Sequence, residues 1–342
     1  MGKMKKPQIF QKIDDAPKGV KLIDAYESSM YELFIVKNPK YKEKNNVVEY
    51  QNFYKAVKFK PVWIYFPWRD VVVKSLPEKE YNILRTARNK NIITEKEQSK
   101  YHQGTFGIIG MSIGSAMLSS IVSTCGPKNI KIADDDTIEV SNLNRMHATI
   151  LDVGLPKTTV AAQRSWEVDP FLNIDPFKTI NKENLRAFLE NDQKLDAIVD
   201  AMDSLAMKVT LRRICRELKI PVLMATSNGD NSIIDVERYD IDENTKIFGG
   251  RIEEGELMNM ETFTQKEWVA KAVKIVDKSI LVDRLLESIP KIGKTLSGVP
   301  QLATTVNMSG AAISFIIRKI LTGDKIISGR YIIGLDSVFY PQ

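Results

Sequence analysis

The clearest pattern of apolar and polar positions in this chain lies between residues 105 and 145. An apolar run at residues 106–109 turns at the glycine-rich residues 110–115 into a second apolar segment, which reaches Gly126. A third apolar run, residues 130–133, leads into three consecutive carboxylates. Short apolar runs are typical of buried strands, and longer ones of helices. The pattern therefore predicts a strand, a tight turn, a helix and a strand that ends in acidic residues.

Apolar runs and amphipathic segments alternate through the rest of the chain. We predict strands at residues 172–177, 195–200 and 221–226, and helices at residues 157–168, 182–189, 204–218 and 303–321. Strands that alternate with helices are typical of a parallel sheet covered by helices. Residues 232–239 predict an antiparallel extension, residues 326–335 a last strand pair, and residues 240–300 a helical insertion. The predicted fold class is α/β, a Rossmann-like, doubly wound and mainly parallel sheet.

The first hundred residues follow a different pattern, in which helices and strands are mixed. We predict a helix at residues 25–33, strands at residues 62–69 and 71–76, and a helix that begins near Pro77. This last helix is predicted to carry Arg85 and Arg88. No linker rich in Pro, Gly or Ser separates this region from the following strand. We therefore predict an N-terminal α+β accessory region, residues 1–100, packed on a second domain, residues 101–342.

Composition places the chain among ordinary globular proteins, with 43% hydrophobic and 27% charged residues. No apolar segment follows the basic N-terminus, so we expect no signal peptide. Arg318 and Lys319 interrupt the most apolar late stretch, so we expect no membrane span. The two cysteines, Cys125 and Cys215, suit a reducing cytoplasm and exclude a four-cysteine zinc site. The net charge of +6 is scattered along the chain, so we do not expect nucleic acid as a partner.

The strand, turn, helix and strand around residue 110 have the order of a nucleotide site. Free N–H groups and the helix dipole attract phosphate to a helix N-terminus, here the turn that contains Gly110, Ser112 and Gly114. A carboxylate about 20 residues further on accepts a ribose hydroxyl in such units. Asp134 has this spacing from Gly114, and Asp136 lies beside it. The stretch therefore predicts a nucleotide bound through its phosphates and its ribose.

The sequence Gly-x-Ser-x-Gly also occurs at the nucleophile of some hydrolases, which would make Ser112 the reacting residue. That fold places its acid and then its histidine well downstream of the serine. Here His102 precedes Ser112 and His147 follows it closely. We therefore do not expect Ser112 to be a nucleophile, and both histidines are interpreted as surface or packing residues.

Polar residues gather where the predicted strands end. Amide, hydroxyl and guanidinium groups follow the acidic strand at Ser141, Asn142 and Arg145, and Lys157 opens the next predicted helix. Asp203 follows the end of a further strand. Carboxyl ends of parallel strands form the edge at which open α/β sheets bind ligands. Cations neutralise charge that develops on phosphates, and a carboxylate can hold Mg²⁺. This set predicts an enzyme that cleaves ATP, with ATP and Mg²⁺ as its cofactors.

These residues resemble the ThiF/MoeB superfamily, whose fold is shared with ubiquitin-activating enzymes. The family pattern is an aspartate at a strand end, then Ser-Asn-Leu-x-Arg, Pro-Lys, and an Asp-x-x-Asp strand end. Here these are Asp134, residues 141–145, Pro156-Lys157, and residues 200–203. Within the superfamily the chain is similar to a subfamily with a Gly-x-Ser-x-Gly-Ser loop, some members of which are fused to a nitroreductase-like domain.

The resemblance implies adenylation of a C-terminal carboxylate by ATP, with release of pyrophosphate. The carboxylate would belong to a small ubiquitin-like or sulfur-carrier protein, or to a peptide. By the same resemblance Asp134 would hold the ribose, Ser141, Asn142, Arg145 and Lys157 the phosphates, and Asp203 the Mg²⁺. Arg88 would reach into the partner's site of a homodimer, with Arg85 as the second candidate.

Two departures from the family pattern leave alternatives open. The glycine-rich loop is shortened and carries Met111 and Ser112, so a non-catalytic nucleotide- or NAD-binding partner subunit is the first alternative. An adenylating enzyme that modifies a tRNA base is another. Neither cysteine follows the strand at residues 221–226, where relatives that form a thioester keep theirs. We therefore predict adenylation without a covalent thioester on this chain.

Overall fold

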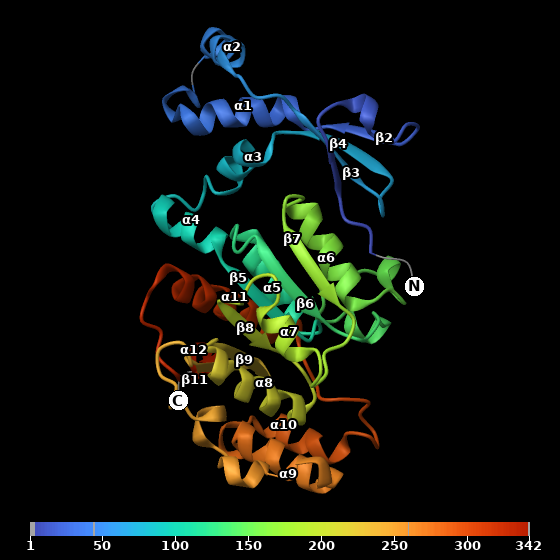
Figure 1. Ribbon diagram of the computed structural model, residues 1–342, viewed down its shortest axis with the longest axis vertical. Coiled ribbons are helices and arrows are strands. Elements are labelled where there is room, and N and C mark those ends of the chain that lie inside the picture. The colour runs from blue at the N-terminus through green and yellow to red at the C-terminus, as the bar shows by residue number, and fades with distance from the viewer. Residues whose placement is uncertain (1–3, 44, 259, 341–342) are drawn as a thin grey trace. The chain divides into compact units, whose positions relative to one another are not determined.

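The computed structural model describes residues 4–43, 45–258 and 260–340. The chain forms two compact units (Figure 1). The first unit comprises the described residues up to Ser99 together with Ser165–Leu172, and the second comprises Lys100–Arg164 and the described residues from Asn173 onward. Each unit has its own sheet, one of four strands and one of seven. Among the described residues, no helix is long and apolar enough to cross a membrane.

The first unit is a small α+β fold. Its sheet has the order β1-β3-β4-β2, built from β1 (Gln8–Phe10), β2 (Lys21–Asp24), β3 (Val62–Phe66) and β4 (Val71–Ser75). The helices are α1 (Tyr26–Lys37), α2 (Val47–Ala56) and α3 (Glu78–Arg85). Met30 and Leu33 of α1 pack against Leu76 in its core. The sequence analysis placed Arg88 on the helix after Pro77, but that helix ends at Arg85 and Arg88 lies in the turn that follows.

The second unit contains the predicted parallel sheet. In chain order its strands are β5 (Thr105–Ile109), β6 (Asn129–Ala133), β7 (Asn173–Phe177), β8 (Ala197–Asp200), β9 (Val222–Asn228), β10 (Asn231–Glu237) and β11 (Gly329–Gly334). Their spatial order is β11-β10-β9-β8-β5-β6-β7. The strands from β7 to β9 are parallel, whereas β10 pairs antiparallel with both β9 and β11. The predicted fold class is therefore confirmed.

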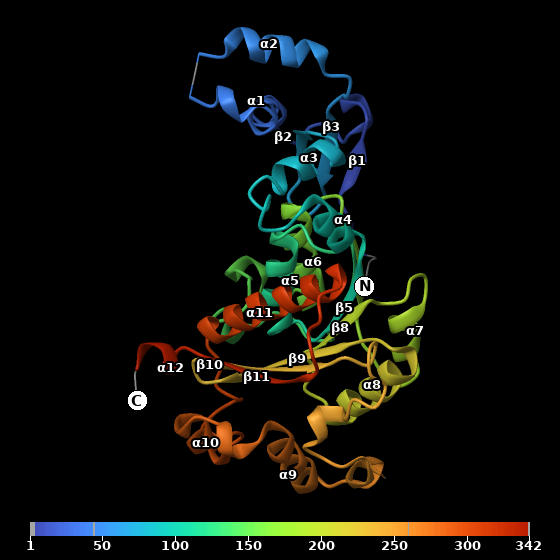
Figure 2. The ribbon, with the colours of Figure 1, turned by 90° about the vertical axis from the view of Figure 1, so that its left-hand side faces the viewer.

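Helices cover both faces of this sheet. The helices that lie wholly or partly in the second unit are α4 (Glu95–Gln103), α5 (Gly114–Ser123), α6 (Lys157–Val168), α7 (Leu185–Glu190), α8 (Leu205–Leu218), α9 (Gln265–Val276), α10 (Asp283–Ser288), α11 (Ala303–Thr322) and α12 (Asp336–Phe339). Figure 2 shows α5 and α11 on one face of the sheet and α7 and α8 on the other. All five residues of β5 are buried, because this central strand is covered from both sides.

The side chains of β10 show how the two layers meet the sheet. The hydroxyl of Ser232 lies 2.7 Å from the hydroxyl of Ser309 on α11. The next residue, Ile233, packs instead with Leu281 and Leu285, beside and on α10. Successive side chains of a strand point to opposite faces, so α10 and α11 lie on opposite sides of β10. This agrees with the alternation that predicted an antiparallel strand at residues 232–239.

Two local predictions differ from the structure. Residues 326–335 were predicted to form a strand pair, but they contain the single strand β11. Its partner is β10, which lies almost a hundred residues earlier, so local sequence could not reveal the pairing. The helix predicted at residues 182–189 begins only at Leu185. Residues 240–300, predicted as a helical insertion, contain α9 and α10 and several single turns of 3₁₀ helix.

Candidate functional site

A cavity of about 740 Å³ opens at the carboxyl ends of the parallel strands in the second unit. Its lining comes from the segments that follow β5, β6, β7 and β8 and from a C-terminal loop. The lining residues include Gly110, Ser112, Asp134, Asp135, Asp136, Asn142, Arg145, Lys157, Asp203 and Gln301. In the sheet, β5 has β6 as its neighbour on one side and β8 on the other, so the strand order reverses its direction at β5. The cavity therefore lies at the topological switch point, where open α/β sheets bind nucleotides.

The glycine-rich turn after β5 depends on the absence of a side chain at Gly110. This residue has φ +97°, and a Cβ atom there would lie 2.1 Å from the carbonyl oxygen of Ala201. Gly110 thus lets two neighbouring segments of the cavity wall approach closely. Gly114 does not line the cavity: a Cβ atom there would lie 2.7 Å from Cγ2 of Ile108. Gly114 therefore allows α5 to pack closely on β5.

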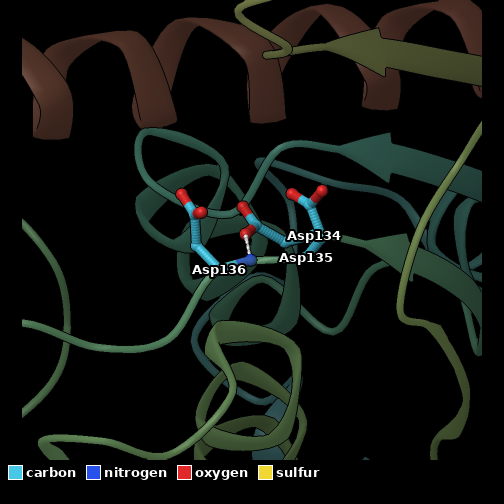
Figure 3. Close-up of side chains that lie close together, drawn as sticks. All are labelled: Asp134, Asp135 and Asp136. Carbon is cyan, nitrogen blue, oxygen red and sulfur yellow. Dashed lines mark hydrogen bonds between the residues drawn. The ribbon is translucent and has the colours of Figure 1, made fainter.

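Asp134 connects the end of β6 to the glycine-rich turn. Its carboxylate accepts hydrogen bonds from the backbone N–H of Met111 (2.6 Å) and of Asp136 (2.9 Å). Figure 3 shows this second bond and the neighbouring carboxylate of Asp135. Burial raises the pKa of the Asp134 carboxyl, although both backbone bonds oppose the shift. The turn is held in place by an acid that still has free lone pairs for a ribose hydroxyl.

Lys157 lies at the start of α6 with a side chain that is only 8% exposed. Its Nζ atom lies 2.7 Å from Asp136 Oδ2 and 4.0 Å from Asp134 Oδ1. A buried cation needs such partners. The sequence analysis assigned Lys157 to phosphates and Asp136 to the nucleotide, and the structure joins the two side chains in an ion pair. A bound phosphate would therefore compete with Asp136 for this ammonium group.

The guanidinium of Arg145 donates hydrogen bonds to three acceptors, one of which lies in the glycine-rich turn. Its Nε donates to Ser112 Oγ (3.3 Å), and its Nη1 donates to the carbonyl of Ser141 (3.1 Å) and to Asn144 Oδ1 (2.9 Å). Burial lowers the pKa of the guanidinium, and the negative charge of Asp203 opposes this shift. Since arginine stays protonated in proteins, a cation faces the cavity here.

Asn142 and Ser141, which precede Arg145 in the chain, differ in burial. Asn142 is buried and lines the cavity, and its Oδ1 accepts the backbone N–H of Glu139 (3.1 Å). The Asn142 amide group can thus donate into the cavity. Ser141 is exposed and does not line the cavity; its hydroxyl donates to Glu139 Oε2 (3.2 Å).

Carboxylates at two strand ends could hold a cation. Asp203 is exposed and lines the cavity just beyond β8. Oxygen atoms of Asp134, Asp135 and Asp136 all lie within 4.8 Å of one another. Carboxylate oxygens are the ligands that Mg²⁺ prefers, so both places fit this ion in donor chemistry. Asp134 and Asp136 of the second group already lie against the ammonium group of Lys157, whereas Asp203 forms no ion pair with another described residue.

Asp200, the last residue of β8, differs from Asp203, which lies three residues further on. It is fully buried and accepts hydrogen bonds from Arg212 Nη1 (2.6 Å) and Lys208 Nζ (2.9 Å). Burial favours the neutral carboxyl, but the charges of Lys208 and Arg212 outweigh it and lower the pKa of Asp200. Asp200 also accepts the backbone N–H of Met202 at 3.2 Å. It therefore shapes the strand end that presents Asp203.

The two arginines considered for a partner's site belong to the first unit. Arg85 forms an ion pair of 2.6 Å with Asp169, whose side chain is 1% exposed. This contact gives Arg85 a structural role within its own unit. Arg88 is exposed, in the turn after α3. Its action across a homodimer stays a prediction.

A C-terminal loop that sequence reasoning did not assign to the site lines one side of the cavity. It contributes Ile292, Gly298, Val299 and Gln301. The glycine-rich turn and these residues are separated by almost two hundred positions, and no strand-end pattern marks the loop. Thr179, Ile180 and Met207 also line the cavity and were not predicted. Apolar lining residues have no distinctive spacing, so only the folded chain reveals them.

These features define a class of protein: an α/β fold of the nucleotide-binding type, in which two cations, Arg145 and Lys157, and the carboxylate of Asp203 line one cavity at the carboxyl ends of the strands. The model of the ThiF family matches residues 85–333, which is more than half of the chain. The chain therefore belongs to the ThiF family.

Similar proteins match different shares of the chain. Uncharacterized protein MT1398 of Mycobacterium tuberculosis is 35% identical over 269 residues, which are 78% of this chain and 37% of that protein. The chain thus spans just over a third of this relative. The tRNA threonylcarbamoyladenosine dehydratase of Bacillus subtilis is 25% identical over 58% of this chain and 76% of its own length. Ubiquitin-activating enzyme E1 1 of Triticum aestivum is 26% identical over 50% of this chain and 18% of its own length.

Solved structures share the fold. The crystal structure of PaaA superposes with a TM-score of 0.52 and 18% identity, and covers 76% of this chain and 81% of its own. The E. coli tRNA N6-threonylcarbamoyladenosine dehydratase, TcdA, in complex with AMP gives a TM-score of 0.52 and 17% identity over 72% of this chain and 98% of its own. At these identities the likeness establishes the fold alone, so the function must be argued from the cavity.

Proposed function

We propose that this chain uses ATP and Mg²⁺ to adenylate a C-terminal carboxylate and releases pyrophosphate. The observation that carries the proposal is the gathering of Arg145, Lys157 and Asp203 around one cavity, at the N-terminus of α5. Two cations and a metal-binding acid suit a triphosphate that is cleaved. A relative named as a ubiquitin-activating enzyme supports the same chemistry.

The chemistry needs no protein nucleophile. An oxygen of the substrate carboxylate attacks the α-phosphorus of ATP, the bond from that phosphorus to the bridging oxygen of the β-phosphate breaks, and pyrophosphate leaves with the electron pair. Arg145 and Lys157 neutralise charge on the phosphate oxygens, and Asn142 donates a hydrogen bond to them. Asp134 orients the ribose. Asp203 would hold Mg²⁺, which would supply further positive charge for the phosphates. Both cysteines are buried and neither lines the cavity, which supports adenylation without a thioester.

The substrate in this proposal is a small ubiquitin-like or sulfur-carrier protein, or a peptide with a free C-terminus. This choice of substrate is supported by the similarity to a ubiquitin-activating enzyme. We also propose a homodimer in which Arg88 acts on the partner's phosphates, and a cytoplasmic location, which the two free cysteines suit.

The test is pyrophosphate release from ATP and Mg²⁺ in the presence of candidate carrier proteins or peptides, each supplied with a free and with an amidated C-terminus. Release only with the free carboxylate supports adenylation. We expect Arg145→Ala and Asp203→Ala each to lower kcat at least about 100-fold, because each removes a charge that the transition state requires. Arg186→Ala is the matched control, since Arg186 lies on α7 and does not line the cavity. Unchanged turnover in both site variants would refute the site.

Two observations favour a different function, that of a subunit that binds a nucleotide or NAD without cleaving it. Lys157 is already neutralised by Asp136, and Ser112 replaces a glycine of the family loop. Calorimetry separates the two readings: a non-catalytic site predicts that NAD competes with ATP and that Mg²⁺ changes neither affinity. A tRNA-modifying adenylating enzyme, as the Bacillus subtilis relative suggests, instead predicts RNA binding that weakens steeply with salt.

A further inference from the structure

The loop on the far side of the cavity, residues 289–301, is named here the C-terminal wall. It follows α10 and leads into α11, and four of its residues line the cavity. One of them, Gln301, has a buried Oε1 atom without a hydrogen-bond partner among the described residues. A buried acceptor without a partner is costly unless a ligand or water satisfies it. The wall thus brings an unused polar atom to the site.

Two hydrogen bonds join the C-terminal side of the cavity to the segment around Arg145. Asn144 Nδ2 donates to the backbone carbonyl of Gln301 at 2.9 Å. His147 Nε2 lies 3.3 Å from Asn307 Oδ1, in α11. Both contacts join residues 144–147 to the C-terminal side of the cavity. They differ because, within the described part of the chain, only Asn144 also contacts Arg145.

Asn144 is engaged at both ends of its side chain. Its Oδ1 accepts the guanidinium of Arg145 at 2.9 Å, while its amide holds the wall. Arg145 also contacts Ser112 of the glycine-rich turn. One amide side chain therefore lies between the wall and the cation that faces the phosphates. His147 has no such link to Arg145 among the described contacts.

We propose that Asn144 is a positioning residue that couples the C-terminal wall to Arg145. When the wall lies over the cavity, the carbonyl of Gln301 fixes the Asn144 amide, and the amide oxygen then directs the guanidinium toward the phosphates. When the wall moves away, Arg145 loses one of its three acceptors. This inference rests on the proposed function. In the proposed adenylation, Arg145 would neutralise charge on the phosphates only after the wall has closed over the cavity.

The first experiment needs no nucleotide. Amide hydrogen exchange of residues 289–301 is compared in the wild type, Asn144→Ala and Arg145→Ala. We expect both variants to exchange several-fold faster in the wall, although Arg145 itself makes no hydrogen bond to the wall among those described. Lys157→Ala is the control, since it removes another cation from the same cavity without a link to Asn144. Wall exchange in Arg145→Ala that equals the wild type overturns the proposal.

The second experiment measures ATP affinity by calorimetry with Mg²⁺ present. We expect Asn144→Ala to bind ATP about 10-fold more weakly, because a hydrogen bond to a charged group is lost. His147→Ala, which breaks only the neighbouring tether, should stay within about twofold of the wild type. Equal losses in the two variants would mean that Asn144 is merely a tether and would overturn the proposal. Failure of the wild type to bind ATP would instead contradict the proposed function, and the exchange experiment would still decide the coupling.

Discussion

Gly110 and Gly154 show how the same residue type does different work at two positions of the second unit. Both have positive φ, +97° and +87°. A Cβ atom at Gly110 would collide with the backbone of Ala201, whereas one at Gly154 would meet nothing within 4 Å. Glycine is therefore needed for backbone conformation at Gly154, and for conformation and space at Gly110. Of these requirements, only the need for space at Gly110 affects the wall of the cavity.

We predict that Gly110→Ala lowers the free energy of unfolding by about 3 kcal/mol or more, because the backbone segments that follow β5 and β8 would have to separate. Gly154→Ala should cost about 1–2 kcal/mol, the strain of a left-handed backbone alone. Urea denaturation of both variants measures the difference. Equal losses would show that the close approach to Ala201 is not a constraint.

A buried charge network joins three elements beneath the cavity. Arg212 of α8 donates to Asp200 at the end of β8, and its Nε lies 2.8 Å from Glu237 Oε2 at the end of β10. Glu237 also accepts the backbone N–H of Phe248, in the insertion. Arg212 and Glu237 are at most 2% exposed. Such a network fixes the relative positions of strands and insertion, because any shift would leave a buried charge unpaired.

Burial raises the pKa of Glu237 to about 7, although Arg212 opposes the shift. The folded state therefore takes up a proton near pH 7, whereas the unfolded state does so only near the ordinary glutamate pKa of 4.5. This contribution to stability is complete below pH 4.5 and is lost as pH rises through 7. We predict that the wild type gains about 3 kcal/mol relative to Glu237→Gln between pH 8 and pH 4.5. Urea midpoints across this range measure it, and parallel profiles of the two proteins would contradict it.

At the scale of the whole molecule, the match to the ThiF family begins at residue 85 and so includes the end of the first unit. The cavity belongs to the second unit, and Arg88 to the first. In the proposed homodimer, Arg88 of one chain acts at the cavity of the other chain. The family resemblance favours contact between chains.

A complementation experiment tests this. We expect Arg88→Ala and Arg145→Ala each to be inactive alone, whereas their co-expressed mixture regains activity, because the mixed dimer has one cavity with an intact Arg145 and an intact partner Arg88. Arg145→Ala with Asp203→Ala is the control pair, since both defects lie in the chain's own cavity and no mixed site is complete. A mixture of the first pair that stays inactive would place Arg88 outside the partner's site.

Local sequence was enough to predict most elements of the second unit. Strand β5, its glycine-rich turn and α5 follow from apolar runs and glycine positions that are adjacent in the chain. Asp134 and Asp203 were recognised because each follows the end of an apolar run. The pairing of β11 with β10 was not predictable in this way, since the partners are distant in sequence.

The sequence by itself therefore determined the α/β class, the strand ends and the polar residues placed at them, because neighbouring residues set helix and strand periodicity. The tertiary structure alone decided that Asp136 pairs with Lys157, that Asp200 is buried while Asp203 lines the cavity, and that the C-terminal wall meets Asn144. Each of these outcomes depends on contacts between segments far apart in the chain, whose geometry exists only once the sheet and its helices have packed.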